Sequence, residues 1–589
     1  MAALRRVLDS GLLDYPRFRK YTRLVREELS ATYSRDIQKW LLVAPIVGFV
    51  TGVLITGLTI AILKTTWVVV FSAYSNHHSM ILAGLLVGFL LTGLIMAYRT
   101  SDPNEHSTEE VIRSYHERQG VIDMRPFWWK LLAAVTTVGS GGSAALEGPA
   151  IYGGGAIGSW LWTKLRRLRL QPHDRRIMLI SGAAAGMAAA FRAPLTGIIF
   201  ALEMPYKYDI AHEALLPSLI ASVAAYATMA ALLGSEPLFG FSGSTAFSDR
   251  DLAWSAMLGL VCGLITMVFV IAFRRARTFA IHARVPHTIK LLVGGFGTAL
   301  CGLVFVTLFA GPLMPLGPNY EAVREVLSRP HSPATLISFA ILKLAASLCS
   351  IASGGVSALF VPLFLSGGAI GSAFGQAIVR SPTFDLYAAV GMASFIAAGY
   401  KTPLAAVVFV AESTGGHSYI IPSLIGAAVA YAVSGEASVS GDQRVHEVAQ
   451  LAELSGIEVR EVMQREIAGV QAGASMRDFA ASVAANPRAV FAVYEGARAV
   501  GMIAVWQLSR IPPEQWSTIT VGQIADHHVP RVPPDCQVTE ALRLLSRNEG
   551  EQLLFVGGDD GALDGVVTKT DILRALQTRG IARVRDRAE

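Results

Sequence analysis

Charged residues are scarce in this sequence, and their scarcity excludes an ordinary soluble protein. Only 16% of the 589 residues are Asp, Glu, Lys or Arg, whereas 52% are hydrophobic. Segments 80–97, 252–273 and 344–379 contain no charged residue, and segment 41–71 contains only Lys64. Uncharged stretches of about 18 residues or more are long enough to cross a bilayer as helices. The sequence therefore predicts an all-α, multi-span membrane protein surrounded by a lipid bilayer.

Metal-binding and catalytic motifs are also missing. The pairs His77 with His78 and His527 with His528 have no further ligands at metal-site spacing. A GxGxxG pattern at 153–158 lies in an apolar segment without a βαβ unit, which argues against a dinucleotide site. We therefore expect no enzyme, no metal and no required cofactor. The four cysteines, Cys262, Cys301, Cys349 and Cys536, lack disulfide or metal spacing. The first three lie in apolar spans and are expected to be packing residues.

Basic residues gather in three segments, 5–20, 164–176 and 274–290. The first has no apolar core ahead of it and is not a secretory signal. Because loops rich in Lys and Arg stay in the cytoplasm, we expect all three segments there, with 1–36 forming an amphipathic cytoplasmic helix. The net charge of +6 then reflects membrane topology and does not indicate a nucleic-acid partner. The expected location is a cell (inner) membrane.

The central part of the chain is an internal duplication. Segment 145–159 returns as 358–372, and both copies end in Gly-Gly-Ala-Ile-Gly-Ser. A second pair, 192–203 and 401–412, follows at nearly the same spacing. Apolar segments broken by Gly and Pro at matching places in two halves indicate the binding site of a transporter. We expect the two halves to have opposite orientations in the membrane.

Glu147 is the position at which the two copies differ in charge. It begins a predicted helix, and Phe360 occupies its place in the second copy. Free backbone N–H groups at a helix N-terminus favour an anion. An ionisable group between apolar spans marks an ion path by default, because burying a charge there is costly. We therefore interpret Glu147 as functional and the Phe360 helix start as an anion site. The simpler alternatives are a helix-stabilising charge and a core aromatic.

The composition becomes that of a soluble domain after about residue 436. Two units of similar pattern follow, each predicted as helix, strand, turn, strand and helix. Paired units of this size resemble a tandem of CBS modules, a fold that often binds adenine nucleotides. The predicted organisation is an N-terminal helix (1–36), a membrane domain (37–440, with repeats at roughly 80–235 and 252–435), a linker (441–458), a first CBS module (459–512) and a second module with a tail (513–589).

The membrane region resembles the CLC family of chloride channels and proton–chloride antiporters. The resemblance is carried by Glu-Gly-Pro at 147–149, the shared Gly-Gly-x-Ile-Gly tail, the segment 186–194 and Phe-Val-Pro at 360–362. It implies a homodimer with one pathway per subunit for chloride or a similar small inorganic anion. By this similarity Glu147 is the gating glutamate, and the anion is bound at Gly148, Leu359 and Phe360.

Three positions depart from the family pattern. Ser107 fits the serine that binds the central anion, but the glycines and proline around it are absent. Segment 107–110 also fits a capping box, in which Ser107 is the N-cap and Glu110 reaches back. Ser440 stands where the family tyrosine that coordinates the central anion is expected, so fluoride or nitrate stays open beside chloride. Antiporters usually carry two consecutive acids where this chain has Glu203 and Met204.

Methionine at the relay position cannot hold a proton, so we favour a channel or a loosely coupled exchanger, with Glu203 as the candidate for a proton pathway. A proton-coupled chloride or fluoride antiporter is the alternative. A membrane-anchored nucleotide sensor and a cation transporter belong to other classes, and a cation path would need rings of acids or carbonyls. The candidate nucleotide contacts are Thr568 and Asp571, whereas the first CBS module has Ala504 and Gln507 at the equivalent places.

Overall fold

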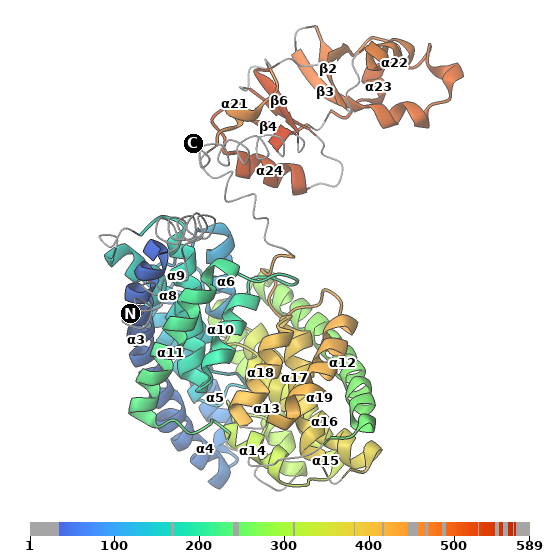
Figure 1. Cartoon of the computed structure of the whole chain (residues 1–589). Helices are drawn as coiled ribbons and strands as arrows, with labels where there is room; N and C mark the ends of the chain where they lie inside the picture. The colour runs from blue at the N-terminus through green and yellow to red at the C-terminus, as the bar shows by residue number, and fades with distance from the viewer. Residues whose placement is uncertain are drawn as a thin grey trace, which may run out of the picture. The chain divides into compact units, whose positions relative to one another are not determined.

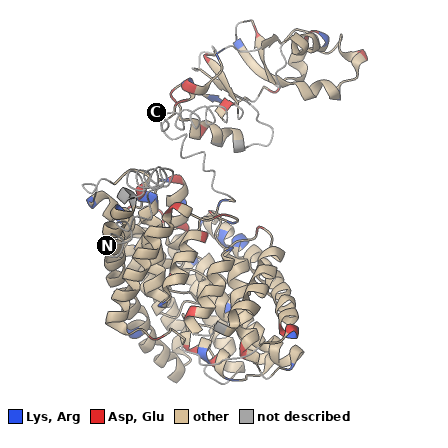
Figure 2. Ribbon diagram, viewed as in Figure 1, with Lys and Arg blue, Asp and Glu red and all other residues tan. Residues whose placement is uncertain are grey.

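A computed structural model describes residues 34–165, 170–239, 247–309, 313–381, 383–414, 417–445, 457–465, 469–485, 490–496, 498–527, 529–547, 553–557, 563–568 and 571–572. The predicted helix at 1–36 lies almost entirely outside these residues. The chain forms two compact units, Met1–Glu447 and Val448–Glu589. Seven helices among the described residues are long and apolar enough to cross a membrane, and all belong to the first unit. Figure 2 shows how sparsely Lys, Arg, Asp and Glu are placed along its helices.

The first half of the membrane unit is entirely helical. One continuous apolar stretch, Ile37–Asn76, accounts for the predicted long span at 41–71. The elements are α3 (Ser34–Thr59), the π-helix η2 (Ile60–Thr66), α4 (Trp67–Asn76), α5 (Met80–Arg99), α6 (Ser107–Glu117), α7 (Phe127–Gly139), α8 (Glu147–Lys164), α9 (Asp174–Phe191), α10 (Pro194–Glu203), the short 3₁₀ helix η4 (His212–Ala214) and α11 (Leu215–Leu233).

The second half repeats this order of helices. Its elements are α12 (Asp249–His282), α13 (His287–Leu308), α14 (Tyr320–Ser328), α15 (Pro333–Ala352), α16 (Phe360–Phe374), the π-helix η5 (Gly375–Val379), α17 (Phe384–Tyr400), α18 (Pro403–Thr414), the 3₁₀ helix η6 (His417–Tyr419) and α19 (Ile420–Val433). The uncharged stretch 344–379 is not one span, because the turn at 353–359 separates α15 from α16. In Figure 1, α8 to α11 gather on one side of the unit and α16 to α19 on the other.

The repeated glycines allow each half to pack two helices backbone against backbone. A Cβ on Gly158 of α8 would lie 1.9 Å from the Met178 carbonyl oxygen of α9. A Cβ on Gly371 of α16 would lie 2.0 Å from the Tyr387 carbonyl oxygen of α17. Any larger residue would force these helices apart, because protein interiors leave no such space. The shared Gly-Gly-Ala-Ile-Gly-Ser therefore builds the same helix pair twice.

Equivalent residues of the two halves also meet each other. Ala145 and Ala358, which stand at the same place in the two copies, form an antiparallel bridge, with the Ala145 N–H 3.3 Å from the Ala358 carbonyl oxygen. The Glu203 carboxylate at the end of α10 accepts backbone N–H bonds at the start of α18, from Leu404 (3.2 Å) and Ala405 (3.0 Å). Glu412 of α18 accepts from α10 in return. The two helices are therefore antiparallel, as expected of inverted halves.

The soluble unit contains two small sheets of the same topology. In each, the first strand is parallel to the second and the second is antiparallel to the third. The first sheet has β1 (Gly469–Gln471), β2 (Val490–Glu495) and β3 (Arg498–Ala504) with α22 (Met476–Ala485), and the second has β4 (Arg531–Val532), β5 (Leu553–Val556) and β6 (Gly565–Thr568) with α24 (Val538–Arg547). A two-turn 3₁₀ helix, η7 (Val505–Arg510), follows β3, and the 3₁₀ helix η8 (Pro513–Gln515) comes next along the chain.

The two sheets exchange their short leading helices. Helix α21 (Val459–Val462) packs on β6 of the second sheet, and α23 (Val521–Ile524) packs on β3 of the first. The Gln464 N–H donates to the Val566 carbonyl at 2.8 Å, and the Met502 N–H donates to the Asp526 carbonyl at 2.9 Å. Neither sheet is therefore completed by one continuous stretch of chain.

Candidate anion site

Two helix N-termini converge where the duplicated segments meet. The bridge between Ala145 and Ala358 lies two residues before each helix, so α8 begins with Glu147 and α16 begins with Phe360 beside it. A side chain on Gly148 would collide with the Ser357 backbone, because its Cβ would lie 2.8 Å from the carbonyl carbon. The glycine thus permits the close approach of the two copies at this point.

The Glu147 carboxylate occupies the N-terminus of α16. Its Oε1 accepts a hydrogen bond from the Phe360 N–H at 2.5 Å and another from the Tyr400 hydroxyl at 3.2 Å. The side chain is fully buried, and Oε2 has no hydrogen-bond partner among the described residues. Backbone N–H groups at a helix start are the donors that a small anion would use. The carboxylate therefore fills a place that suits an anion.

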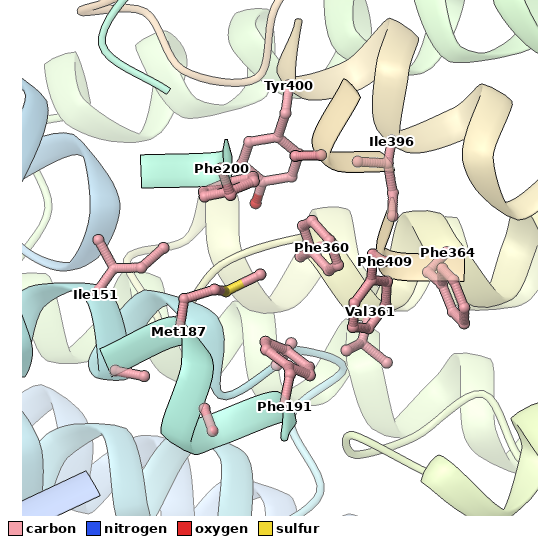
Figure 3. Packing of buried hydrophobic residues seen from close by; sticks show 14 of the residues in the cluster. Ile151, Met187, Phe191, Phe200, Phe360, Val361, Phe364, Ile396, Tyr400 and Phe409 are labelled. Carbon is pink, nitrogen blue, oxygen red and sulfur yellow. The ribbon is translucent and has the colours of Figure 1, made fainter. Parts of the chain in front are cut away.

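Aromatic rings close around this N-terminus. The ring of Phe360 lies 4.9 Å from that of Phe409, 5.4 Å from Phe200 and 5.7 Å from Phe191, measured between centroids. Figure 3 shows these rings and Tyr400 pointing toward one another from separate helices. Such an environment excludes water and strengthens electrostatic interactions within it. The Glu147 charge is consequently held by few donors in a dry pocket.

Tyr400 supplies the hydroxyl that the sequence analysis did not find. It is the last residue of α17, and its hydroxyl accepts the Leu359 N–H at 2.8 Å while donating to Glu147. Ser440 does lie nearby, but the tyrosine comes from a different part of the chain than the segment in which the family places it. The duplication could have indicated Tyr400 as a candidate, because this tyrosine stands in the second copy where Phe191 stands in the first.

A cavity continues from Tyr400 away from Glu147. The described residues that line it include three predicted ligand positions, Ser107, Leu359 and Ser440, together with Tyr400. Glu109 and Arg277 also line it. The hydroxyl groups of Ser107, Tyr400 and Ser440 belong to its lining together with the Arg277 guanidinium, so the cavity offers several donors to a small anion. The structure thus brings Ser107, Leu359 and Ser440 to one cavity, and Phe360, the residue after Leu359, donates its N–H to Glu147.

The predicted start of a helix at Ser107 is correct, but the predicted capping box is wrong. Helix α6 begins at Ser107, its N-cap is His106, and no side chain caps it. Ser107 has a φ of 61°, a left-handed conformation that a residue with a side chain adopts only under constraint. Glu110 does not reach back, because its carboxylate binds the buried Lys130 Nζ at 2.6 Å.

Glu203 is engaged away from the cavity. Its two carboxylate oxygens bind the N–H groups that open α18, and it is not among the described residues that line the cavity. Met204 is buried, and its carbonyl accepts a hydrogen bond from the Gln443 amide at 3.0 Å. Glu203 therefore caps the N-terminus of α18, and Met204, which stands at the family's relay position, has no group that can carry a proton.

In the soluble unit, Thr568 and Asp571 lie together at the end of β6. Asp571 Oδ2 accepts from the Thr568 N–H (3.0 Å) and hydroxyl (2.6 Å), and Oδ1 accepts from the Gln464 amide. At the matching place in the first module, the Ala504 N–H donates to Gln507 Oε1 at 2.7 Å. The turn is thus shared by both modules, but only the second one has an acid.

Comparison with known proteins identifies the membrane unit. The sequence profile described as "Voltage gated chloride channel" matches residues 83–435, more than half of the chain. This chain belongs to that family. The profile of the CBS domain matches residues 521–578, within the second module of this CLC protein.

Individual relatives agree with the family. The H(+)/Cl(−) exchange transporter ClcA of Vibrio parahaemolyticus is 27% identical over 411 residues, covering 65% of this chain and 84% of ClcA. A CLC-type fluoride/proton antiporter has a similar fold with a TM-score of 0.60 at 23% identity, covering 69% of this chain and 98% of that one. A eukaryotic CLC transporter aligns with a TM-score of 0.58 at 17% identity, covering 91% and 98%. At these identities the solved structures establish the fold alone.

Proposed function

We propose that this CLC protein moves chloride or a similar small anion through the cavity at Tyr400, with Glu147 as the gate. The observation that carries the proposal is the hydrogen bond from the Phe360 N–H to the Glu147 carboxylate in a fully buried site. In this state the protein's own carboxylate holds the donor that a passing anion needs. An anion and Glu147 therefore exclude each other at the start of α16.

The gate opens when Glu147 leaves this position. Protonation removes the charge that the helix N-terminus attracts, so the neutral side chain is released more easily than the carboxylate. The N–H groups of Leu359 and Phe360, with the hydroxyls of Tyr400, Ser107 and Ser440, then bind the anion along the path. Several weak donors in series suit conduction, because each must release the anion as readily as it binds it.

The basic end of the unit faces the cytoplasm in this proposal. Arg274, Arg275 and Arg277 lie in the last part of α12, and Lys290 lies in the first turn of α13. Basic loops stay in the cytoplasm, so the cavity opens inward at Arg277. The protein works as a homodimer in a cell (inner) membrane, with the N-terminus and the CBS modules inside.

We favour a channel or a loosely coupled exchanger over a tightly coupled antiporter. Met204 cannot carry a proton, and Glu203 is bound to the start of α18. Relatives such as ClcA are named as proton–chloride exchange transporters, so a proton-coupled antiporter is the alternative. A regulatory role of the CBS pair would use an adenine nucleotide contacted by Thr568 and Asp571, since the acid is present in this module alone.

The proposal is tested with the purified full chain in liposomes loaded in turn with chloride, fluoride and nitrate. A potassium leak removes the opposing voltage, and anion efflux is recorded. We expect rapid efflux of at least chloride, and the order of the three rates defines the selectivity. If none of the three anions leaves faster than from loaded liposomes without protein, the transport function is wrong. A membrane-anchored nucleotide sensor then becomes the better interpretation.

A further inference from the structure

An ion pair between α6 and α12 forms part of the lining of the cavity that contains Ser107 and Tyr400. Arg277 Nη1 donates to Glu109 Oε1 at 2.9 Å, and Nη2 contacts Oε2, so the guanidinium and the carboxylate meet through two bonds. The side chains of Arg277 and Glu109 are only 19% and 20% exposed. Paired bonds of this kind are stronger than a single contact and fix the orientation of both groups.

Arg277 stands between two cavities. The first contains Ser107, Tyr400 and Ser440, and Arg277 lines it together with Glu109. The second is lined by Asn104, Lys290 and Gly354, and Arg277 lines this one too. His106 and Ile351 are also common to both. Of the three residues that the two cavities share, Arg277 is the one that carries a permanent charge, so its guanidinium is available to an anion in either cavity.

The arrangement at Arg277 parallels the one at Glu147. In both places a carboxylate of the protein occupies a donor that lies on the anion path. At Glu147 the donor is a backbone N–H, whereas at Glu109 it is a fixed cation. A guanidinium in a partly dry cavity attracts a small anion more strongly than a hydroxyl does, because its interaction with the anion is between full charges.

We propose that Arg277 is a second anion-binding site at the inner mouth, and that Glu109 is its competing internal ligand. The ligand class is a small monovalent inorganic anion, and the inference rests on the transport function proposed above. An arriving anion takes the guanidinium from Glu109, and Glu109 takes it back when the anion moves on to Ser107. Lys290 in the second cavity adds a cation that draws anions toward Arg277.

Other charges surround the pair. Asp442, Arg113 and Arg274 lie close enough to act on Glu109 electrostatically. Arg113 is one helical turn after Glu109 on α6, but its guanidinium binds Asp442 at 3.0 Å and lines neither cavity. Arg113 therefore offers a control: it has the same guanidinium as Arg277 and lies on the same helix as Glu109, but it lines neither cavity.

The test measures exchange of radioactive chloride across liposomes at equal chloride concentrations on both faces, over a concentration series. Glu109→Gln frees the guanidinium, so the half-saturating chloride concentration should fall about tenfold. Arg277→Gln leaves the carboxylate unpaired on the path, so exchange at low chloride should fall by about tenfold or more. Exchange at low chloride should be faster in the double variant than in Arg277→Gln alone. Arg113→Gln should change the half-saturating concentration much less than either single variant, because Arg113 binds Asp442 and acts on Glu109 only through space.

Opposite changes in chloride exchange at low chloride, an increase in Glu109→Gln and a decrease in Arg277→Gln, distinguish a binding site from an ion pair that only stabilises the fold. If the pair only holds α6 to α12, both variants lose stability and neither changes the half-saturating concentration, which would overturn the proposal. Should Arg277→Gln fail to fold, Glu109→Gln decides alone. A half-saturating chloride concentration in Glu109→Gln that is equal to or higher than that of the wild type contradicts the competition. A wild type without anion exchange would refute the transport function itself, which is a separate outcome.

Discussion

The two halves of the membrane unit have the same framework. Each packs two helices through the same glycine motif, and each ends the second of these helices on a basic residue in the left-handed conformation, Arg192 (φ 55°) and Lys401 (φ 60°). The acids at the ends of α10 and α18 bind each other's helix starts reciprocally. The duplication has therefore preserved the positions that set the backbone.

The halves differ at the anion site. The first half contributes Glu147 and Phe191, and the second contributes Phe360 and Tyr400 at the equivalent positions. One carboxylate can leave while the opposing helix N-terminus stays open to an anion. If both copies had a carboxylate at this position, both helix N-termini would be occupied. An anion would then compete with a carboxylate at either one. In the proposed function, the asymmetry of these two pairs is what allows a symmetric framework to act as a gate.

The largest effect is expected where the framework itself is broken. Gly158→Ala and Gly371→Ala each place a Cβ about 2 Å from a carbonyl oxygen of the neighbouring helix, which cannot be accommodated. Overpacking a tight interior of this kind should cost about 3 kcal/mol or more. Both variants should give little protein that is monodisperse in gel filtration.

Gly57→Ala is the matched control for this prediction. Gly57 lies within α3, and no atom is found within 4 Å of its added Cβ. Alanine there should be neutral or stabilising by up to about 1 kcal/mol, because alanine favours the helix. If Gly371→Ala were tolerated and Gly158→Ala were not, the two helix pairs would not be equivalent and the comparison of the halves would fail.

Much of this framework was predictable because it depends on backbone and on local pattern. Apolar stretches gave the spans, and identical motifs at 154–159 and 367–372 gave the duplication. The helix start at Phe360, inside the uncharged stretch 344–379, was predicted from the duplication, but the end of α15 at Ala352 was missed, because absence of charge does not reveal a turn. The reciprocal role of Glu203 and Glu412 was missed as well, because a cap between distant helices leaves no local pattern.

The site was predictable only in its copied parts. Glu147 and Phe360 lie in the duplicated motifs, and in the structure the Phe360 N–H donates to the Glu147 carboxylate. Tyr400 was missed because its hydroxyl reaches the site from a position where the other half has Phe191. The partnership of Glu109 with Arg277 could not be predicted, since 168 residues separate them. Side-chain substitutions within a repeat are thus the positions that sequence patterns predict least.

The next largest effect concerns Glu147, the acid without a counterpart. Glu147→Gln removes the charge that competes with anions, so efflux should increase and become nearly independent of pH. In the wild type, efflux should fall as the pH rises, because the charged carboxylate binds the Phe360 N–H and closes the path. A hydrogen bond to a charged group corresponds to about a ten- to hundredfold change in the open fraction.

Efflux of chloride from liposomes over a pH series measures this effect. Glu412→Gln serves as the control, because Glu412 is also an acid at a helix start but caps α10, with Thr196 N–H at 2.7 Å. Its pH dependence should equal that of the wild type. A Glu147→Gln variant that titrates like the wild type would assign the gate to another group.

A smaller effect is expected from the other asymmetric pair. Tyr400→Phe makes the second half resemble the first at this position and removes only the oxygen that binds Leu359 and Glu147. Loss of one donor weakens the closed state, so efflux at high pH should rise about three- to tenfold. Pocket packing should persist, since the ring remains among Phe200 and Phe360.

Tyr206→Phe is the control for Tyr400→Phe. Tyr206 is buried, and its hydroxyl lies 3.3 Å from that of Tyr115, away from the described cavity lining. Its efflux should not change. Equal rates for Tyr400→Phe and wild type at every pH would mean that the Tyr400 hydroxyl does not hold the gate.

A smaller loss of stability than in the glycine variants is expected if Glu203 caps a helix and does not relay protons. Glu203→Gln and Glu412→Gln each remove a carboxylate from a helix N-terminus, which should cost about 1–2 kcal/mol in either half. The midpoint of thermal unfolding should fall by similar amounts. Under a chloride gradient, external pH should show no proton movement at a fixed ratio to chloride. Fixed-ratio movement abolished by Glu203→Gln and retained in Glu412→Gln would make this protein an antiporter with Glu203 in its relay.

The smallest effect on transport is expected in the soluble unit, where one acid again has no counterpart. Asp571→Ala removes the carboxylate beside Thr568, whereas Gln507→Ala changes the equivalent position of the first module. If an adenine nucleotide binds at the second module, Asp571→Ala should weaken ATP or AMP binding by about tenfold or more in calorimetry, and Gln507→Ala should not. Chloride efflux without nucleotide should be the same in both variants and in the wild type. Equal nucleotide affinities in the two variants would remove Asp571 as the contact, and the single acid would then serve only to hold Thr568 and Gln464 in the turn.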